Sequence, residues 1–137
     1  MSKSDFSKGR GFAQIIRQET VPLEGQQNKS IETQLWTGHV LFENGEEWNT
    51  SGVDVTEMDN GKGTVRGNQV ITHRDGSTIT NSYTGTVKAV KNSNRFAGTG
   101  EWKWTSTTGR LAGAKASGTF SFEQDGDKFT NVFSGTA

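Results

Sequence analysis

The sequence predicts an all-β fold, a closed eight-stranded antiparallel up-and-down barrel, and three observations lead to this prediction. Turn-forming residue pairs recur about every 16 residues along the chain. The stretches between them are rich in Thr, Val, Trp and Phe and alternate inward and outward residue types, as strands with one buried face do. No stretch shows the apolar period of an amphipathic helix. Without helices to cover a one-sided sheet, closure into a barrel is favoured because it also removes exposed edges.

The turn signals set the order of the elements. Asn-Gly, Asp-Gly and related pairs favour tight hairpins because these residue types tolerate a positive φ. Such pairs occupy residues 44–45, 60–61, 75–76, 92–93, 108–109 and 125–126. We therefore expect strands over residues 11–23, 30–43, 47–59, 62–74, 78–91, 94–107, 115–124 and 127–137. The preceding segment, residues 1–10, is expected to be flexible.

Length and charge limit the class of protein. The 137 residues fit a single domain, residues 1–137. Lys plus Arg and Asp plus Glu each number 15, so the net charge is zero and no basic field attracts nucleic acid or anionic lipid. The chain has no Cys, no apolar run long enough to span a bilayer and no apolar leader. We expect a cytoplasmic protein without nucleic-acid or membrane partners.

Turn lengths predict which residues lie opposite each other. A tight turn at residues 92–93 sets Tyr83 opposite Trp102, and a three-residue loop at residues 75–77 sets Gln69 opposite Tyr83. The same reasoning predicts the pairs Asp59–Lys62, Asn81–Trp104, Val65–Val87, Gly67–Gly85, Gly85–Gly100, Phe42–Trp48, Gly38–Gly52 and Phe122–Phe129. Glycines inside the strands have two interpretations: they permit the curvature of a small barrel, or they leave floor space for a ligand.

The predicted pairings gather the large aromatic residues on one inward face. These residues are Trp36, Trp48, Trp102, Trp104, Tyr83, Phe42, Phe96, Phe120, Phe122, Phe129 and Phe133. Polar residues share this face, namely Thr50, Asp54, Thr56, Gln69, His73, Asn81 and Asn131. Because a buried polar group is costly without a partner, they mark either a binding site or a network that satisfies itself.

The candidate site follows from this inward face. The ligand-binding candidates are Trp36, Trp48, Trp102, Trp104, Phe120, Phe133, Asn131 and His73, and the catalytic candidates are Tyr83, Asn81, Asp54 and Gln69. Asp54 is interpreted as the only inward carboxylate, and burial would raise its pKa into the range useful for acid–base work. A register slip would instead turn Asp54 outward. His73 has a second interpretation as a solvated residue at a strand end, and His39 is expected to face outward.

Two segments carry a resemblance to a known family. The sequence FAGTGEWKW at residues 96–104, followed by TGRLAGAKASGTF at residues 108–120, resembles the strand–turn–strand element of allene-oxide-cyclase-like and dirigent-like barrels. The resemblance implies an eight-stranded antiparallel barrel with a hydrophobic lumen and frequent homo-oligomerisation. In catalytic members the lumen steers the cyclisation or coupling of an apolar substrate without a cofactor.

Three functional hypotheses follow. The first is a cofactor-free barrel that binds an apolar small organic molecule in an aromatic lumen and promotes its cyclisation or isomerisation. The second is a non-catalytic binder that resembles calycins such as avidin and the lipocalins. The third is a structural or oligomerising barrel whose lumen is filled by its own side chains. Neither histidine belongs to a spacing that would hold zinc, and we expect no metal site and no cofactor.

Overall fold

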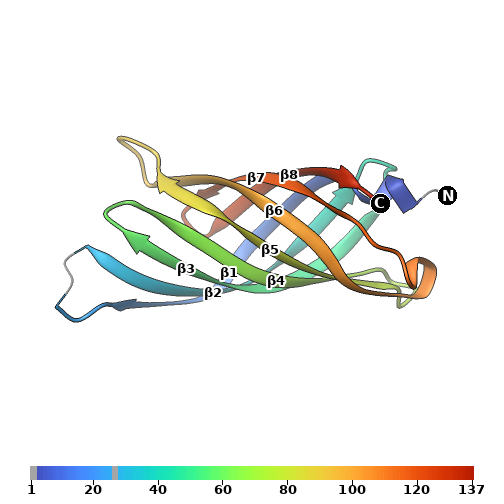
Figure 1. Ribbon diagram of the computed structural model, residues 1–137, viewed down its shortest axis with the longest axis horizontal. Coiled ribbons are helices and arrows are strands. Elements are labelled where there is room, and N and C mark those ends of the chain that lie inside the picture. Colours follow the sequence, from blue (N-terminus) through green and yellow to red (C-terminus); the bar gives the residue numbers. More distant parts are fainter. Residues whose placement is uncertain (1–2, 26–27) are drawn as a thin grey trace.

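The predicted strands form one closed antiparallel barrel in a computed structural model, which describes residues 3–25 and 28–137 (Figure 1). The strands follow each other around the barrel in chain order, and β1 closes it by pairing with β8. They are β1 (Gly9–Pro22), β2 (Lys29–Phe42), β3 (Glu47–Asp59), β4 (Lys62–Thr72), β5 (Thr78–Ala89), β6 (Arg95–Thr108), β7 (Ser117–Asp125) and β8 (Lys128–Thr136). The predicted fold class is confirmed.

Helical structure is minor. The described part of the chain holds two short 3-10 helices, η1 (Lys3–Phe6) and η2 (Gly109–Leu111). Within residues 3–25 and 28–137, no helix has the length and apolarity required to cross a membrane.

Two hairpin turns lie where their residue types predict them. Asn60 and Gly61 have φ values of 55° and 86°, the left-handed backbone of a two-residue hairpin turn. This turn sets Asp59 opposite Lys62, as predicted. Asn92, with a φ of 62°, bends the chain between β5 and β6, whose register agrees with the predicted pair Tyr83–Trp102.

Three other hairpins have their turn centred one residue away from the predicted position. The β2–β3 and β4–β5 loops are centred one residue earlier, on residues 44 and 75, and the β7–β8 turn lies one residue later, at residues 126–127. Each displacement shifts the strand register by two residues. The pairs predicted wrongly are replaced by Val40–Trp48, Gly38–Thr50, Val65–Gly85, Gly67–Tyr83, Gln69–Asn81 and Phe122–Asn131. Because side chains alternate with a period of two, the shift leaves every residue on its predicted face.

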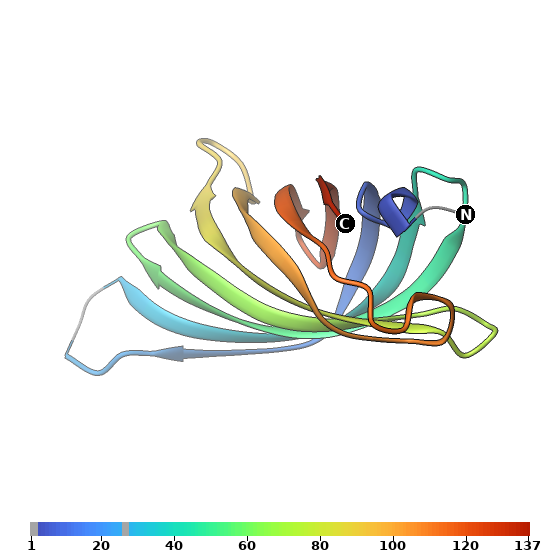
Figure 2. The same ribbon diagram turned by 45° about the vertical axis from the view of Figure 1, so that its right-hand side comes forward.

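One hairpin projects beyond the closed part of the barrel. Strand β8 pairs with β1 only over Gly9–Gln14, and a bulge interrupts the β1–β2 register between Ile15 and Arg17. The remainder of β1 pairs with β2 alone, while β2 also pairs with β3 over Lys29–Leu41, so this part of β1 is an edge strand. Figure 2 shows the β1–β2 hairpin extending past the neighbouring strands. The exposed side chains of Ile16 and Val21 lie on this edge strand.

The two ends of the barrel differ in how they are filled. We call the end with both described chain termini and the loops 43–46, 73–77 and 109–116 the closed end, and the opposite end the far end (Figure 1). Large side chains pack tightly at the closed end, where Trp48, Phe42 and Phe6 are at most 2 % exposed. Their rings meet edge to face with centroids 5.0 to 5.6 Å apart, a favourable aromatic geometry.

The segment predicted to be flexible contributes to this packing. Phe6 is 2 % exposed and Ser7 is 1 % exposed, and the Ser7 hydroxyl donates to the Gly135 carbonyl over 3.1 Å. Residues 3–10 are therefore anchored to the closed end at Phe6 and Ser7, while residues 1 and 2 of the predicted segment lie outside the described residues.

Glycines within the strands make room for aromatic rings of the protein itself. A Cβ on Gly67 would lie 2.5 Å from the Tyr83 ring, and one on Gly52 would lie 2.4 Å from the Trp36 ring. The same relation joins Gly98 to Phe122, Gly100 to Phe120 and Gly135 to Trp102. The row Gly67, Gly85 and Gly100 is only partly formed, since Gly85 faces Gly100 but Gly67 faces Tyr83. At these five glycines the floor space predicted for a ligand is occupied by rings.

Candidate functional site

The barrel encloses a cavity of about 130 Å³. It lies among the inward side chains of the strands and reaches residues near the far-end termini of several of them, including Met58, Phe96 and Gln124. Ten of the twelve predicted site residues line it: Trp36, Asp54, Gln69, Asn81, Tyr83, Trp102, Trp104, Phe120, Asn131 and Phe133. The inward side chains that the alternation pattern predicts therefore surround a common cavity.

Asp54 and Tyr83 meet in the lumen from strands that are not neighbours. The Tyr83 hydroxyl donates to Asp54 Oδ2 over 3.0 Å. Strand β4 lies between them, and its Gly67 pairs with Asp54 on one side and with Tyr83 on the other. A Cβ at that position would lie 2.5 Å from Tyr83 Oη and 2.7 Å from Asp54 Cβ. The glycine therefore lets the tyrosine reach across β4 to the carboxyl group.

Burial dominates the electrostatics of this pair. Asp54 is 6 % exposed, and this burial raises its pKa from 3.8 to about 6. Hydrogen bonds from the side chains of Tyr83 and Trp36 lower the pKa, while the charge of Glu32 raises it further. The pKa of Tyr83 is raised above its ordinary value by burial and by the nearby Asp54 charge, so its hydroxyl keeps its proton. Asp54 can thus exchange a proton near neutral pH while Tyr83 remains a donor.

A second carboxylate corrects the prediction that Asp54 is alone. Glu32 lines the cavity, and Gln34, 3 % exposed, lies directly opposite Asp54 on β2. The Gln34 amide donates to Glu32 Oε1 over 2.5 Å. Both residues alternate with Trp36 in the segment 30–43, so the same period of two that predicts an inward Trp36 could have identified them.

A second polar group lies on the neighbouring strands β3, β4 and β5. The Thr50 hydroxyl lies 3.0 Å from Gln69 Oε1 and 3.1 Å from the Val70 carbonyl, and can donate to either. Gln69 faces Asn81 rather than Tyr83, because the β4–β5 register is shifted by two residues. Asn81 is 5 % exposed and is paired with Trp104 as predicted.

Three buried polar atoms of the described residues have no hydrogen-bond partner within the protein: Asp54 Oδ1, Asn81 Oδ1 and Asn131 Oδ1. All three residues line the cavity. A buried acceptor without a partner costs about 1–3 kcal/mol. The predicted alternative of a network that satisfies itself is therefore only partly realised: the Thr50 hydroxyl has an acceptor in Gln69 or Val70, whereas these three oxygens have no partner.

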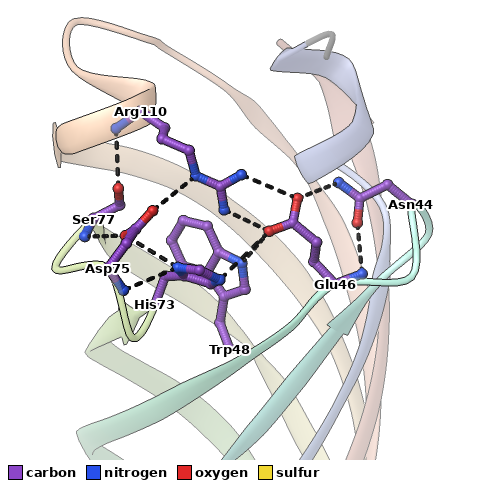
Figure 3. A network of polar contacts seen from close by, with 7 residues as sticks. All are labelled: Asn44, Glu46, Trp48, His73, Asp75, Ser77 and Arg110. Carbon is purple, nitrogen blue, oxygen red and sulfur yellow. Dashed lines mark hydrogen bonds and ion pairs between the residues drawn. The ribbon is translucent and has the colours of Figure 1, made fainter.

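Two of the predicted ligand-binding residues, Trp48 and His73, do not line the cavity. Trp48 is 1 % exposed because it is enclosed at the closed end, with its ring 5.0 Å from the His73 ring. The His73 side chain is 19 % exposed and is fixed in a polar cluster above Trp48 (Figure 3). Both side chains lie on the inward face of their strands, as the alternation predicts. Packing at the closed end leaves no cavity beside them. His39, by contrast, faces outward as predicted, with its side chain 57 % exposed.

The polar cluster joins the loops of the closed end. Arg110 contacts Glu46 at 2.5 Å and Asp75 at 3.1 Å, and its guanidinium lies 5.5 Å from the centre of the Trp48 ring. Asp75 accepts from the Ser77 backbone N–H over 2.7 Å, which is the main reason why its pKa falls to about 2. The hydrogen bond from Arg110 likewise lowers the pKa of Glu46. Figure 3 shows these side chains converging over Trp48, so the cluster covers the packed end of the barrel.

No group of three or more His, Cys, Asp or Glu side chains suited to a metal ion occurs among residues 3–25 and 28–137. Comparisons of the chain with protein-family models, with curated proteins and with solved structures found no match.

Proposed function

We propose that the barrel binds a small organic molecule in its lumen, and that the lumen residues hold this molecule between aromatic rings and buried oxygen atoms. The observation that carries the proposal is the set of three unpartnered oxygens around one enclosed cavity. A filled structural barrel would leave these atoms unsatisfied at a cost in stability, whereas a ligand with polar hydrogens offsets that cost.

The cavity volume limits the size of the molecule. Empty protein cavities of about 150 Å³ accept a benzene molecule, so a space of about 130 Å³ fits a compound with one ring or a short aliphatic chain. The closed end offers no route to the lumen, since Phe6, Phe42 and Trp48 fill it. Entry is therefore expected at the far end, where the cavity reaches Met58, Phe96 and Gln124.

Titration of the protein with single-ring compounds tests this proposal. Benzyl alcohol, followed by isothermal calorimetry and by the fluorescence of Trp36, Trp102 and Trp104, is expected to bind one molecule per chain and to shift the indole emission. Phe120→Trp reduces the cavity and should weaken binding, whereas Leu35→Trp, at a position that is 41 % exposed and does not line the cavity, provides the matched control. Binding that is equal in both variants, or absent in the wild type, would contradict a lumen site.

A catalytic role is the second candidate, and the Asp54–Tyr83 pair favours it. A carboxyl group with a pKa of about 6 is suited to accept and return a proton at neutral pH. Asp54 would remove a proton from a carbon next to a carbonyl group and return it at another carbon, so that the molecule is isomerised without a cofactor. Tyr83 and Asn81 would position the carboxyl and the substrate, and Gln69, held by Thr50, would support Asn81. Cyclisation of a flexible substrate would use the same lumen to hold the substrate in its reactive conformation.

Conversion of 3-cyclohexenone to 2-cyclohexenone is a suitable reaction for testing this role, since the substrate has one ring and the proton moves between two of its carbons. The wild type is expected to accelerate it, and Asp54→Asn to abolish the acceleration while benzyl alcohol still binds. Acceleration that persists in Asp54→Asn would remove this residue from the mechanism. Binding without any acceleration would favour the non-catalytic binder.

A further inference from the structure

The fully buried polar atoms that lack a partner are all of one kind. Asp54 Oδ1, Asn81 Oδ1 and Asn131 Oδ1 are acceptors, and the unpartnered buried side-chain atoms of the described residues include no nitrogen donor. Asp54 is only 6 % exposed and Asn81 only 5 % exposed. A group that satisfies these atoms must bring hydrogen-bond donors into the cavity.

The charges around the cavity have a single sign. Asp54 and Glu32 both line it, from the adjacent strands β3 and β2. The described lining residues include no Lys or Arg. His39, the only histidine among them, directs its side chain outward, where it is 57 % exposed and lies 3.9 Å from Glu47. A buried carboxylate without a cationic partner is unfavourable, and a positive charge placed beside it would offset that cost.

The walls of the cavity suit the same charge. The rings of Trp36, Trp102, Trp104, Tyr83, Phe120 and Phe133 line it. Aromatic faces carry a negative electrostatic potential and attract ammonium groups, most strongly where water is excluded. Rings, acceptors and carboxylates therefore select for one type of molecule.

We infer that the ligand of the lumen is a small organic cation, a protonated amine with a body no larger than one ring, whose ammonium group lies against Asp54. This inference rests on the proposed function, because it names the chemical class of the molecule that the lumen binds. The ammonium group supplies three donors to the acceptors around it, and the apolar body packs on the rings. A neutral or anionic molecule of the same shape lacks the attraction to Asp54 and Glu32.

Three molecules of nearly equal size separate the two proposals: benzylamine, benzyl alcohol and benzoate, titrated at pH 7.5 by calorimetry. Benzylamine is expected to bind at least about tenfold more tightly than benzyl alcohol, and benzoate more weakly than either. Equal affinities for the amine and the alcohol would overturn the inference but leave the lumen site intact. Failure of all three to bind would overturn both proposals.

Substitution of the carboxylates tests which of them causes the preference for benzylamine over benzyl alcohol. Asp54→Asn should reduce benzylamine affinity about tenfold and reduce that of benzyl alcohol by a smaller factor, because the shape is preserved and the charge is lost. Glu32→Gln should reduce it less, and it provides a second test if the first variant does not fold. Glu57→Gln removes an equal charge from an exposed outward position on β3 and should change neither affinity. A loss of benzylamine binding in Glu57→Gln equal to that in Asp54→Asn would contradict a site at Asp54.

Discussion

The closed end and the lumen are built from the same residue types, but they differ in the packing and hydrogen-bond partners that these residues have. At the closed end, Trp48 contacts Phe6, Phe42 and His73 through its ring, and its indole N–H donates to Glu46. In the lumen, Trp102 and Trp104 border a cavity, and the nearby Asn81 has an unpartnered oxygen. This contrast indicates that packing at the closed end stabilises the barrel, whereas the lumen contains polar groups without hydrogen-bond partners. A rigid scaffold that carries a binding site has this arrangement.

Removal of the central ring at the closed end should give the largest effect on stability. Trp48→Ala deletes a side chain that is 1 % exposed and leaves a cavity among Phe6, Phe42 and Ile71, at an expected cost of about 3–5 kcal/mol. Urea denaturation followed by circular dichroism measures it. Val53→Ala, at a position 44 % exposed, should cost less than about 1 kcal/mol. Similar losses in the two variants would show that the closed end is not the stabilising region.

Replacement of the buried carboxyl group in the lumen should raise the free energy of unfolding, whereas Trp48→Ala lowers it. The pKa of Asp54 is raised from 3.8 to about 6 in the folded protein, so folding favours the protonated form. The stability that this group contributes is complete below pH 3.8 and is lost as the pH rises to about 6. Asp54→Asn avoids this loss and should stabilise the protein above pH 6 by up to about 3 kcal/mol.

Unfolding free energies of wild type and Asp54→Asn, measured between pH 4 and pH 8, test this prediction. The difference between them should grow with pH and level off above about pH 6.5. Glu57→Gln, at an exposed site, controls for the change in net charge. A variant that is less stable than the wild type at every pH would contradict the contrast between the two regions.

Loss of the glycine between Asp54 and Tyr83 should have an intermediate effect. A Cβ at Gly67 would lie 2.5 Å from Tyr83, so Gly67→Ala forces the ring away from Asp54 and should cost about 1–3 kcal/mol. The same substitution made in a Tyr83→Leu background should cost less, because the clashing ring is absent. Denaturation of the four proteins gives both values. Additive costs would show that the contact with the Tyr83 ring is not the reason for the glycine.

Weakening of the polar cluster at the closed end should give the smallest effect. Arg110→Lys keeps the charge but loses the planar fork that joins Glu46 to Asp75. We expect a decrease in Tm that is smaller than that of Trp48→Ala and that narrows in high salt, because the ion pairs are partly exposed. Arg66→Lys, at an exposed position on β4, should leave Tm unchanged. A decrease in Tm that is independent of salt would indicate that packing on Trp48 matters more than the ion pairs.

The faces of the strands could be predicted from the sequence more reliably than the pairs across them. Alternation around Trp36 and Tyr83 follows from the period of two and needs no knowledge of the neighbouring strand. Pairing depends on the centre of each turn, and Asp75 shows why this was missed: its carboxylate accepts from the Ser77 N–H and draws the turn one residue back. The prediction that Gln69 lies opposite Tyr83 was wrong for this reason.

The candidate site shows the same division. A barrel of eight strands with its indoles and several polar groups inside can be predicted from the sequence, because alternation and turn chemistry are local properties. Which of those groups meet depends on the three-dimensional arrangement of the strands. Asp54 and Tyr83 are joined across an intervening strand, and Trp48 is enclosed by Phe6 from the start of the chain. Such contacts depend on register, closure and packing, which are set by residues distant in sequence acting together.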